Sequence, residues 1–99
     1  MLKAVWGGAV VAASERCQEV EGNCYFPPNS LVKEYFRVSS TRTKCGWKGR
    51  AHYYHVVVSG LENIDGAWYY PRTKLAANHI KGWVAFWRGV EILGEKLKD

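Results

Sequence analysis

Residues 51–58, Ala-His-Tyr-Tyr-His-Val-Val-Val, form the run that most restricts the fold, because it is dense in aromatic and β-branched side chains. Such side chains pack well on the pleated surface of a sheet. The run ends at Ser59-Gly60, a pair typical of a turn. A β-strand is therefore predicted here, and we expect it to run through the centre of the sheet with its alternate residues buried.

Shorter β-prone runs surround this strand. Residues 3–6 and 9–13 flank Gly7-Gly8, a pair that tolerates the positive φ angles of a tight turn, so they predict a first hairpin. Further strands are predicted at residues 17–21, 35–38, 67–70, 83–87 and 90–93, with the last two joined as a hairpin at Gly89.

Other segments are predicted to form helices or turns, or to interrupt strand pairing. A short helix is predicted at residues 31–34, after Pro27-Pro28, with Asn29 or Ser30 as its cap, and a second one at residues 74–80. Residues 63–66 carry a turn signal. The hydroxyl-rich residues 39–43 should compete with regular strand pairing.

A chain of 99 residues has room for one hydrophobic core, so residues 1–99 are predicted to form a single domain. The elements predict a mainly β fold of short antiparallel strands, in a rolled or two-layer sheet with one or two short helices. No stretch approaches the roughly 20 apolar residues of a membrane-spanning helix. The early Gly7-Gly8 turn also leaves no room for a secretory signal, so we expect a cytoplasmic protein with no membrane contact.

The three cysteines, Cys17, Cys24 and Cys45, are odd in number and include no Cys-x-x-Cys pair. This pattern argues against both a disulfide framework and a thiolate zinc site, so reduced thiols are expected. His52 and His55 are predicted to lie on opposite faces of a strand. We therefore expect no bound metal and no cofactor.

The positive charge is concentrated in the middle of the chain. No acidic residue lies between Glu34 and Glu62, whereas five basic residues do: Arg37, Arg42, Lys44, Lys48 and Arg50. A basic segment rich in aromatic residues indicates an anionic partner, although a solvated basic face with no ligand is an equal alternative.

Several motifs together resemble the family catalogued as domain of unknown function 427, and the resemblance spans nearly the whole chain. They are residues 4–8 (AVWGG), 10–12 (VVA), 20–23 (VEGN), 25–28 (YFPP), 43–54 (TKCGWKGRAHYY), 68–71 (WYYP) and 80–86 (IKGWVAF). The chain departs from the family pattern at Gly46 and Thr73, where family members usually or often have proline, which should loosen the backbone there.

The resemblance implies a compact, mostly β fold similar to a β-tent, and it implies no established reaction. The family carries a nucleotidyltransferase-like label. The chain has neither an Asp-x-Asp pair for catalytic magnesium nor a glycine-rich phosphate loop, so we set that label aside.

Cys45 and Lys48 are the candidate catalytic residues, because neighbouring lysines would favour the thiolate of Cys45. The more usual alternative is that Cys45 is a small buried apolar residue. An enzyme would need one of these two groups in a cleft with a lowered pKa. Whether the protein is an enzyme is left open.

Six residues are the candidate ligand-binding set: Trp47, Lys48, Gly49, Tyr54, Trp68 and Tyr70. Gly49 would let a ligand approach the backbone, a lysine would contact an anion and the aromatic rings would form the walls. Core packing is the alternative for each ring. We also expect Lys48→Ala to weaken binding without affecting stability, as for a surface residue presented by a turn.

The leading hypothesis is a small domain that binds an anionic or aromatic small molecule in this basic and aromatic pocket. The first alternative is an enzyme that uses Cys45 or Lys48. The second is a nucleic-acid-binding module, with the basic residues of the middle segment on phosphates and aromatic rings stacked on bases.

Overall fold

The computed structural model describes residues 1–96. Its elements within that range, in chain order, are β1 (Leu2–Trp6), β2 (Ala9–Ser14), β3 (Gln18–Val20), β4 (Asn23–Tyr25), the 3₁₀ turns η1 (Pro28–Ser30) and η2 (Lys33–Tyr35), β5 (Phe36–Cys45), β6 (Gly49–Val58), β7 (Leu61–Tyr69), the 3₁₀ turn η3 (Leu75–Ile80), β8 (Val84–Phe86) and β9 (Glu91–Gly94). The predicted mainly β class is confirmed.

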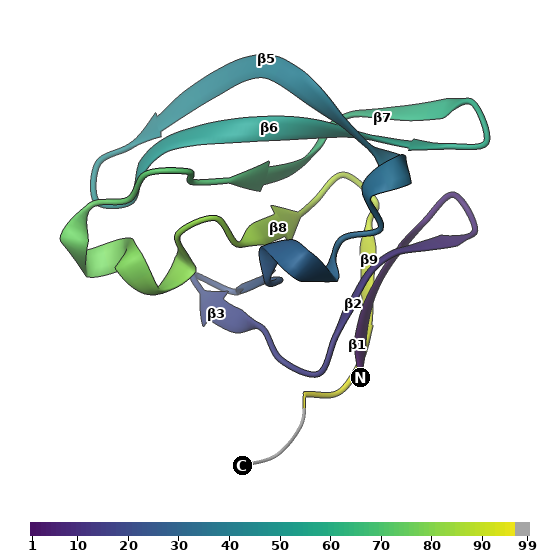
Figure 1. The fold of residues 1–99 in the computed structure, drawn as a ribbon, viewed down its shortest axis with the longest axis horizontal. Coiled ribbons are helices and arrows are strands. Elements are labelled where there is room, and N and C mark those ends of the chain that lie inside the picture. Colours follow the sequence, from purple (N-terminus) through teal and green to yellow (C-terminus); the bar gives the residue numbers. More distant parts are fainter. Residues whose placement is uncertain (97–99) are drawn as a thin grey trace.

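The largest sheet has the order β5-β6-β7-β8, with every neighbouring pair antiparallel. β5 and β6 run side by side across the top of the view in Figure 1. β6 has a partner on both edges, so the prediction that residues 51–58 form a central strand is confirmed. β8 continues the sheet toward β4 through a bridge between Phe26 and Val84.

A second sheet has the order β2-β1-β9 and stands at one end of the largest sheet (Figure 1). Gly7 and Gly8 form the turn between β1 and β2 with φ angles of 61° and 79°, as the first predicted hairpin requires. β9 pairs with β1 and not with β8, so the predicted last hairpin at Gly89 is wrong. The residues around Gly89 indicate a turn, but they cannot show that β1, far away in the sequence, has a free edge with which β9 can pair.

Two hydrophobic clusters lie on the two faces of the largest sheet. Val84 and Phe86 belong to the first cluster and Ala85 to the second, as expected when successive strand residues point to opposite faces. The first cluster continues into β1 and β2, and the second includes Tyr25 and the buried residues of η3. A sheet covered on both faces explains why residues 51–58 are apolar on both sides.

Two local predictions need correction. The predicted helix at residues 31–34 is two separate 3₁₀ turns, η1 and η2, because Leu31 and Val32 are extended. A bridge from Leu31 to Ala12 and a hydrogen bond from the Val32 amide to the Val11 carbonyl (2.8 Å) hold these two residues against β2. Tertiary pairing has overridden helix propensity here.

Residues 63–66 do not form a turn but a bulge inside β7, where the register with β6 shifts between Tyr54 and Val56. Asp65 has a positive φ of 55° at this bulge. Residues 39–43 stay within β5, but the register there also shifts between Val38 and Arg42. The expected disturbance of pairing is therefore a local irregularity in a continuous strand.

Cys17 and Cys24 form a disulfide, with a Cα–Cα distance of 5.7 Å, so the expectation of three reduced thiols is wrong. The β3–β4 hairpin pairs Glu19 with Cys24 and thereby brings Cys17 within reach. Cys45 is a free cysteine. Spacing alone did not reveal the pair, because the strand register decides which cysteines meet.

No helix among residues 1–96 has the length and apolar character needed to cross a membrane.

Candidate ligand-binding site

The six predicted ligand-binding residues and Cys45 do not form one pocket. Tyr70 belongs to the second hydrophobic cluster, and Cys45 and Trp68 pack against it. Tyr54 packs against the first cluster, on the opposite face of the sheet. The sheet itself therefore separates Tyr54 from the rest of the predicted set.

The β5–β6 turn folds the Lys48 side chain inward, contrary to the expectation that the turn would present it to solvent. Lys48 is 6% exposed. Its Nζ forms an ion pair with Glu21, a residue before β4, and lies 5.2 Å from the ring centroid of Trp47 and 5.7 Å from that of Tyr70. The charge of Lys48 is thus satisfied within the protein.

The electrostatics of Lys48 and Glu21 favour the charged forms of both. Burial is the largest single influence on Lys48 and lowers its pKa, but the hydrogen bond to Glu21 and the electrostatic effects of Tyr25, Tyr70 and Cys45 together outweigh it, so the pKa is raised. The hydrogen bond from Lys48 lowers the pKa of the Glu21 carboxyl. A lysine with a raised pKa is protonated at neutral pH, which does not favour a nucleophile or a general base.

Gly49 is required by the packing of the chain on itself. Its φ is 124°, and a Cβ at this position would lie 2.8 Å from the carbonyl oxygen of Arg72. Gly49 also forms a bridge with Thr73. The close approach predicted for a ligand is made by the chain's own backbone.

The other members of this set have structural partners. The indole Nε1 of Trp68 donates a hydrogen bond to the Tyr25 hydroxyl over 3.2 Å, and their rings meet edge to face. Burial raises the pKa of Tyr70 to about 12. Cys45 is partly buried and Trp47 is 39% exposed. Core packing explains Trp68 and Tyr70, whereas Trp47 retains an accessible ring.

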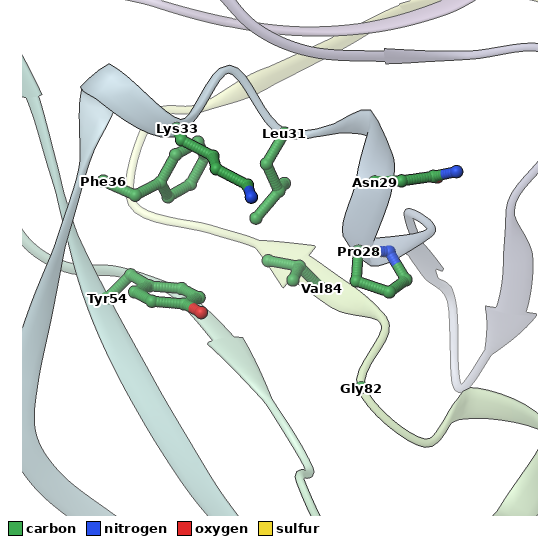
Figure 2. A pocket seen from close by; sticks show the side chains of 8 residues that line it. All are labelled: Pro28, Asn29, Leu31, Lys33, Phe36, Tyr54, Gly82 and Val84. Atoms are coloured by element: carbon green, nitrogen blue, oxygen red, sulfur yellow. The ribbon is translucent and has the colours of Figure 1, made fainter.

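Tyr54 instead lines a cavity of about 520 Å³, which we call the aromatic cavity. It lies between β6, the η1–η2 segment and the start of β8, and Figure 2 shows its walls. They are Pro28, Asn29, Leu31, Lys33, Phe36, Tyr54, Gly82 and Val84. A mostly apolar wall with few polar groups is typical of small-molecule sites, which span about 300–1,000 Å³.

Two polar groups project toward the middle of the aromatic cavity, the ammonium of Lys33 and the hydroxyl of Tyr54 (Figure 2). Burial raises the pKa of Tyr54 to about 12, and the neighbouring Tyr69 adds to the rise. The hydroxyl of Tyr54 is therefore a hydrogen-bond donor at neutral pH. Lys33 is exposed and has no ion pair among residues 1–96.

A second cavity of about 460 Å³ is lined by Arg50, His52, Pro71 and Arg72, and we call it the arginine cavity. Burial lowers the pKa of His52, and the positive charges of Arg42, Arg50 and Arg72 lower it further. His52 is therefore neutral near pH 7. None of Cys45, Trp47, Lys48, Gly49, Trp68 or Tyr70 lines either cavity.

A separate polar cluster joins β5, β6 and β7 at the bulges. The Ser39 hydroxyl donates to Asp65 Oδ1 over 2.6 Å, and the Asp65 amide donates to His55 Nδ1 over 3.1 Å. The hydroxyl is bonded to the carboxylate and not to the imidazole, so this is not the arrangement that activates a serine nucleophile. Within residues 1–96, no three His, Cys, Asp or Glu side chains gather as a metal site would require.

Sequence reasoning missed Lys33, Phe36 and Val84 of the aromatic cavity, and Arg72 of the arginine cavity. Lys33 and Phe36 are three residues apart, in η2 and at the start of β5, and only the fold brings them to Val84 of β8. Pro27-Pro28, which interrupts the strand pattern, was the available signal for the loop that forms the wall. From the sequence, Arg50 is a candidate only for contact with nucleic-acid phosphates, and His52 is considered as a metal ligand.

A family model described as Domain of unknown function (DUF427) matches residues 1–95. No curated protein matches the chain.

Proposed function

The chain belongs to the DUF427 family, a domain of unknown function, and we propose a role from the aromatic cavity: the protein binds a small organic molecule with an apolar or aromatic body and an acidic group. The body would occupy the aromatic cavity. The observation that carries this proposal is the pairing of apolar walls with the ammonium of Lys33, which has no ion pair within residues 1–96, and the neutral hydroxyl of Tyr54; both project inward (Figure 2).

The residues of the aromatic cavity suit a ligand with two parts, a flat apolar body and an acidic group. Phe36 meets the Tyr54 ring edge to face, with centroids 5.6 Å apart, and these two rings offer surfaces for a flat apolar body. Lys33 supplies a point charge that suits a carboxylate, and Tyr54 supplies one neutral hydrogen bond. A hydrogen bond that involves a charged group contributes more than a neutral one, so Lys33 should decide the preference for an acid.

The nucleic-acid alternative has less support because two of the five basic residues in the middle segment are paired. Arg37 forms an ion pair with Glu62, and Lys48 forms one with Glu21. A groove that follows a strand needs a continuous row of available cations. The enzyme alternative has less support because Lys48 is buried and its pKa is raised.

The test compares 2-naphthoate with naphthalene-2-methanol, two probes that share a ring system and differ in the acidic group. We expect naphthoate to bind more tightly, and Lys33→Gln to weaken naphthoate binding about tenfold while leaving the alcohol unchanged, as measured by calorimetry. Tyr54→Phe, which keeps the ring, should weaken both by a smaller factor.

Lys3→Gln is the matched control, because Lys3 is an exposed lysine of β1 that lines neither cavity. If Lys3→Gln weakens naphthoate binding as much as Lys33→Gln does, the effect is one of net charge. The proposal fails in that case, and also if neither probe binds or if both variants at the cavity bind naphthoate as the parent protein does.

A further inference from the structure

The arginine cavity carries positive charge that no carboxylate of residues 1–96 neutralises. Among residues 1–96, Arg50 and Arg72 form no ion pair, whereas Arg37 and Lys48 each contact a glutamate from another part of the chain. Both cavity arginines are exposed, and no hydrogen bond from either guanidinium to the protein is formed within the described range. Their donors are therefore available to a ligand.

The backbone brings these two arginines together. The antiparallel bridge between Gly49 and Thr73 makes Arg50 and Arg72 the next opposed positions in register. A hydrogen bond from the Lys74 amide to the Lys48 carbonyl, 3.1 Å long, holds the same two segments together. Only glycine at position 49 allows the Arg72 carbonyl to come this close. The fold thus places like charges side by side.

More positive charge lies on the same face of the β5–β6 hairpin. Lys44 is directly opposite Arg50, and Arg42 is directly opposite His52. Like charges in directly opposed strand positions are destabilising. The guanidinium of Arg42 is held by the carbonyls of Ser39 and Thr41, at 2.9 and 2.7 Å, so it contributes its field and does not reach into the cavity.

Unpaired like charges around a cavity are typical of an anion-binding site. We propose that the arginine cavity binds the phosphate group of a small phosphomonoester, with Arg50 and Arg72 contacting its oxygens from two sides and His52 as a third polar contact. Guanidinium groups match phosphate oxygens with paired donors. Two arginines from different segments suit a tetrahedral dianion better than a flat carboxylate.

The charge is confined to one corner of the sheet, which favours a single phosphate over a nucleic-acid backbone. The neighbouring basic residue along β5, Arg37, is paired with Glu62. A strand of nucleic acid would require several phosphate contacts in a row, and its affinity would fall steeply with salt. This site does not depend on the aromatic cavity, because the two share no lining residue.

The experiment measures binding of phenyl phosphate by calorimetry at fixed ionic strength, with ten-residue oligothymidylate lacking a terminal phosphate as the second probe. We expect saturable binding of phenyl phosphate that falls at least about tenfold in Arg50→Gln and in Arg72→Gln. Arg37→Gln, which removes the same charge from the other end of β5, should leave the affinity within about twofold. Circular dichroism of each variant establishes that it folds.

Three results would overturn the proposal. The first is no binding of phenyl phosphate to the parent protein at about 10 mM, which corresponds to an affinity too weak to matter. The second is an equal loss in Arg37→Gln, which would make the effect one of net charge. The third is tighter binding of the oligonucleotide than of phenyl phosphate with a steep salt dependence, which would favour a nucleic-acid surface.

Discussion

The ring of Tyr69 stacks on the ring of Tyr54, with centroids 4.7 Å apart and planes 21° apart. The ring of Tyr69 also lies 5.7 Å from the ring of His52, its partner in the β6–β7 register. Tyr54 lines the aromatic cavity and His52 lines the arginine cavity, two residues apart on β6. Tyr69 therefore contacts one lining residue of each cavity.

This contact predicts a change in the titration of Tyr54. Burial is the largest cause of its raised pKa of about 12, and Tyr69 adds to the rise. In Tyr69→Phe the stacked ring remains and the second phenol is lost, so the pKa of Tyr54 should fall but stay above its ordinary value of 10.0. Carbon-13 labelling of tyrosine rings, followed by NMR titration, checks this. An unchanged pKa would mean that burial alone sets it.

Anion binding in the arginine cavity should depend on pH through His52. Burial and then Arg42, Arg50 and Arg72 hold the pKa of His52 below its ordinary value, and a bound anion would raise it. The complex then takes up a proton, so affinity should increase as pH falls from about 8 to about 5.5. Sulfate is the probe, because it stays dianionic over this range. In His52→Gln the sulfate affinity should be flat with pH, and a retained slope would assign the dependence to another group.

Gly49→Ala should destabilise the domain by about 2 kcal/mol, which lowers the Tm by about 10 °C. The added Cβ would meet the Arg72 carbonyl at 2.8 Å, at a φ of 124° that L residues rarely adopt. Gly46→Ala in the same turn is the control, because nothing lies within 4 Å of its added Cβ. Thermal melts of the two variants side by side provide the measurement. Equal melting temperatures would show that the 72–74 segment can move away freely.

Lys48→Ala should lower the Tm by about 5–10 °C, because the side chain is 6% exposed and packs under two aromatic rings. This replaces the expectation from sequence that stability would be unaffected. Lys48→Met keeps the apolar stem of the side chain and should lower the Tm by less than Lys48→Ala does. If both variants have the Tm of the parent protein, the Lys48–Glu21 pair contributes nothing to stability.

The disulfide predicts one reactive thiol in denatured, unreduced protein and three after reduction. Mass spectrometry after alkylation counts them and identifies Cys45 as the free residue. A disulfide that closes so short a loop contributes about 2.5 kcal/mol in the chain-entropy model, so reductant should lower the Tm. Three reactive thiols without reductant would contradict the Cys17–Cys24 pair. The same count tests the predicted cytoplasmic location, because disulfides are rare in that compartment.

Much of the fold follows from local chemistry. Residues 51–58 predict a central strand, and Gly7-Gly8 predict a hairpin, because side-chain shape and backbone freedom act over a few residues. The failures concern long-range pairing. β9 joins β1, and Leu31 joins β2 as a bridge rather than a helix, since hydrogen bonds to distant strands outweigh local propensity.

For the candidate sites, the chain alone predicts a basic middle segment, many aromatic residues and Tyr54 among the binding candidates. The fold then distributes these residues among separate sites. It buried Lys48 against Glu21, turned Tyr54 to the opposite face, and set Arg72 beside Arg50. The numbers of charged and aromatic residues are properties of the chain. Whether a given charge is neutralised depends on its neighbours, and strand register and bridges bring those neighbours from distant positions.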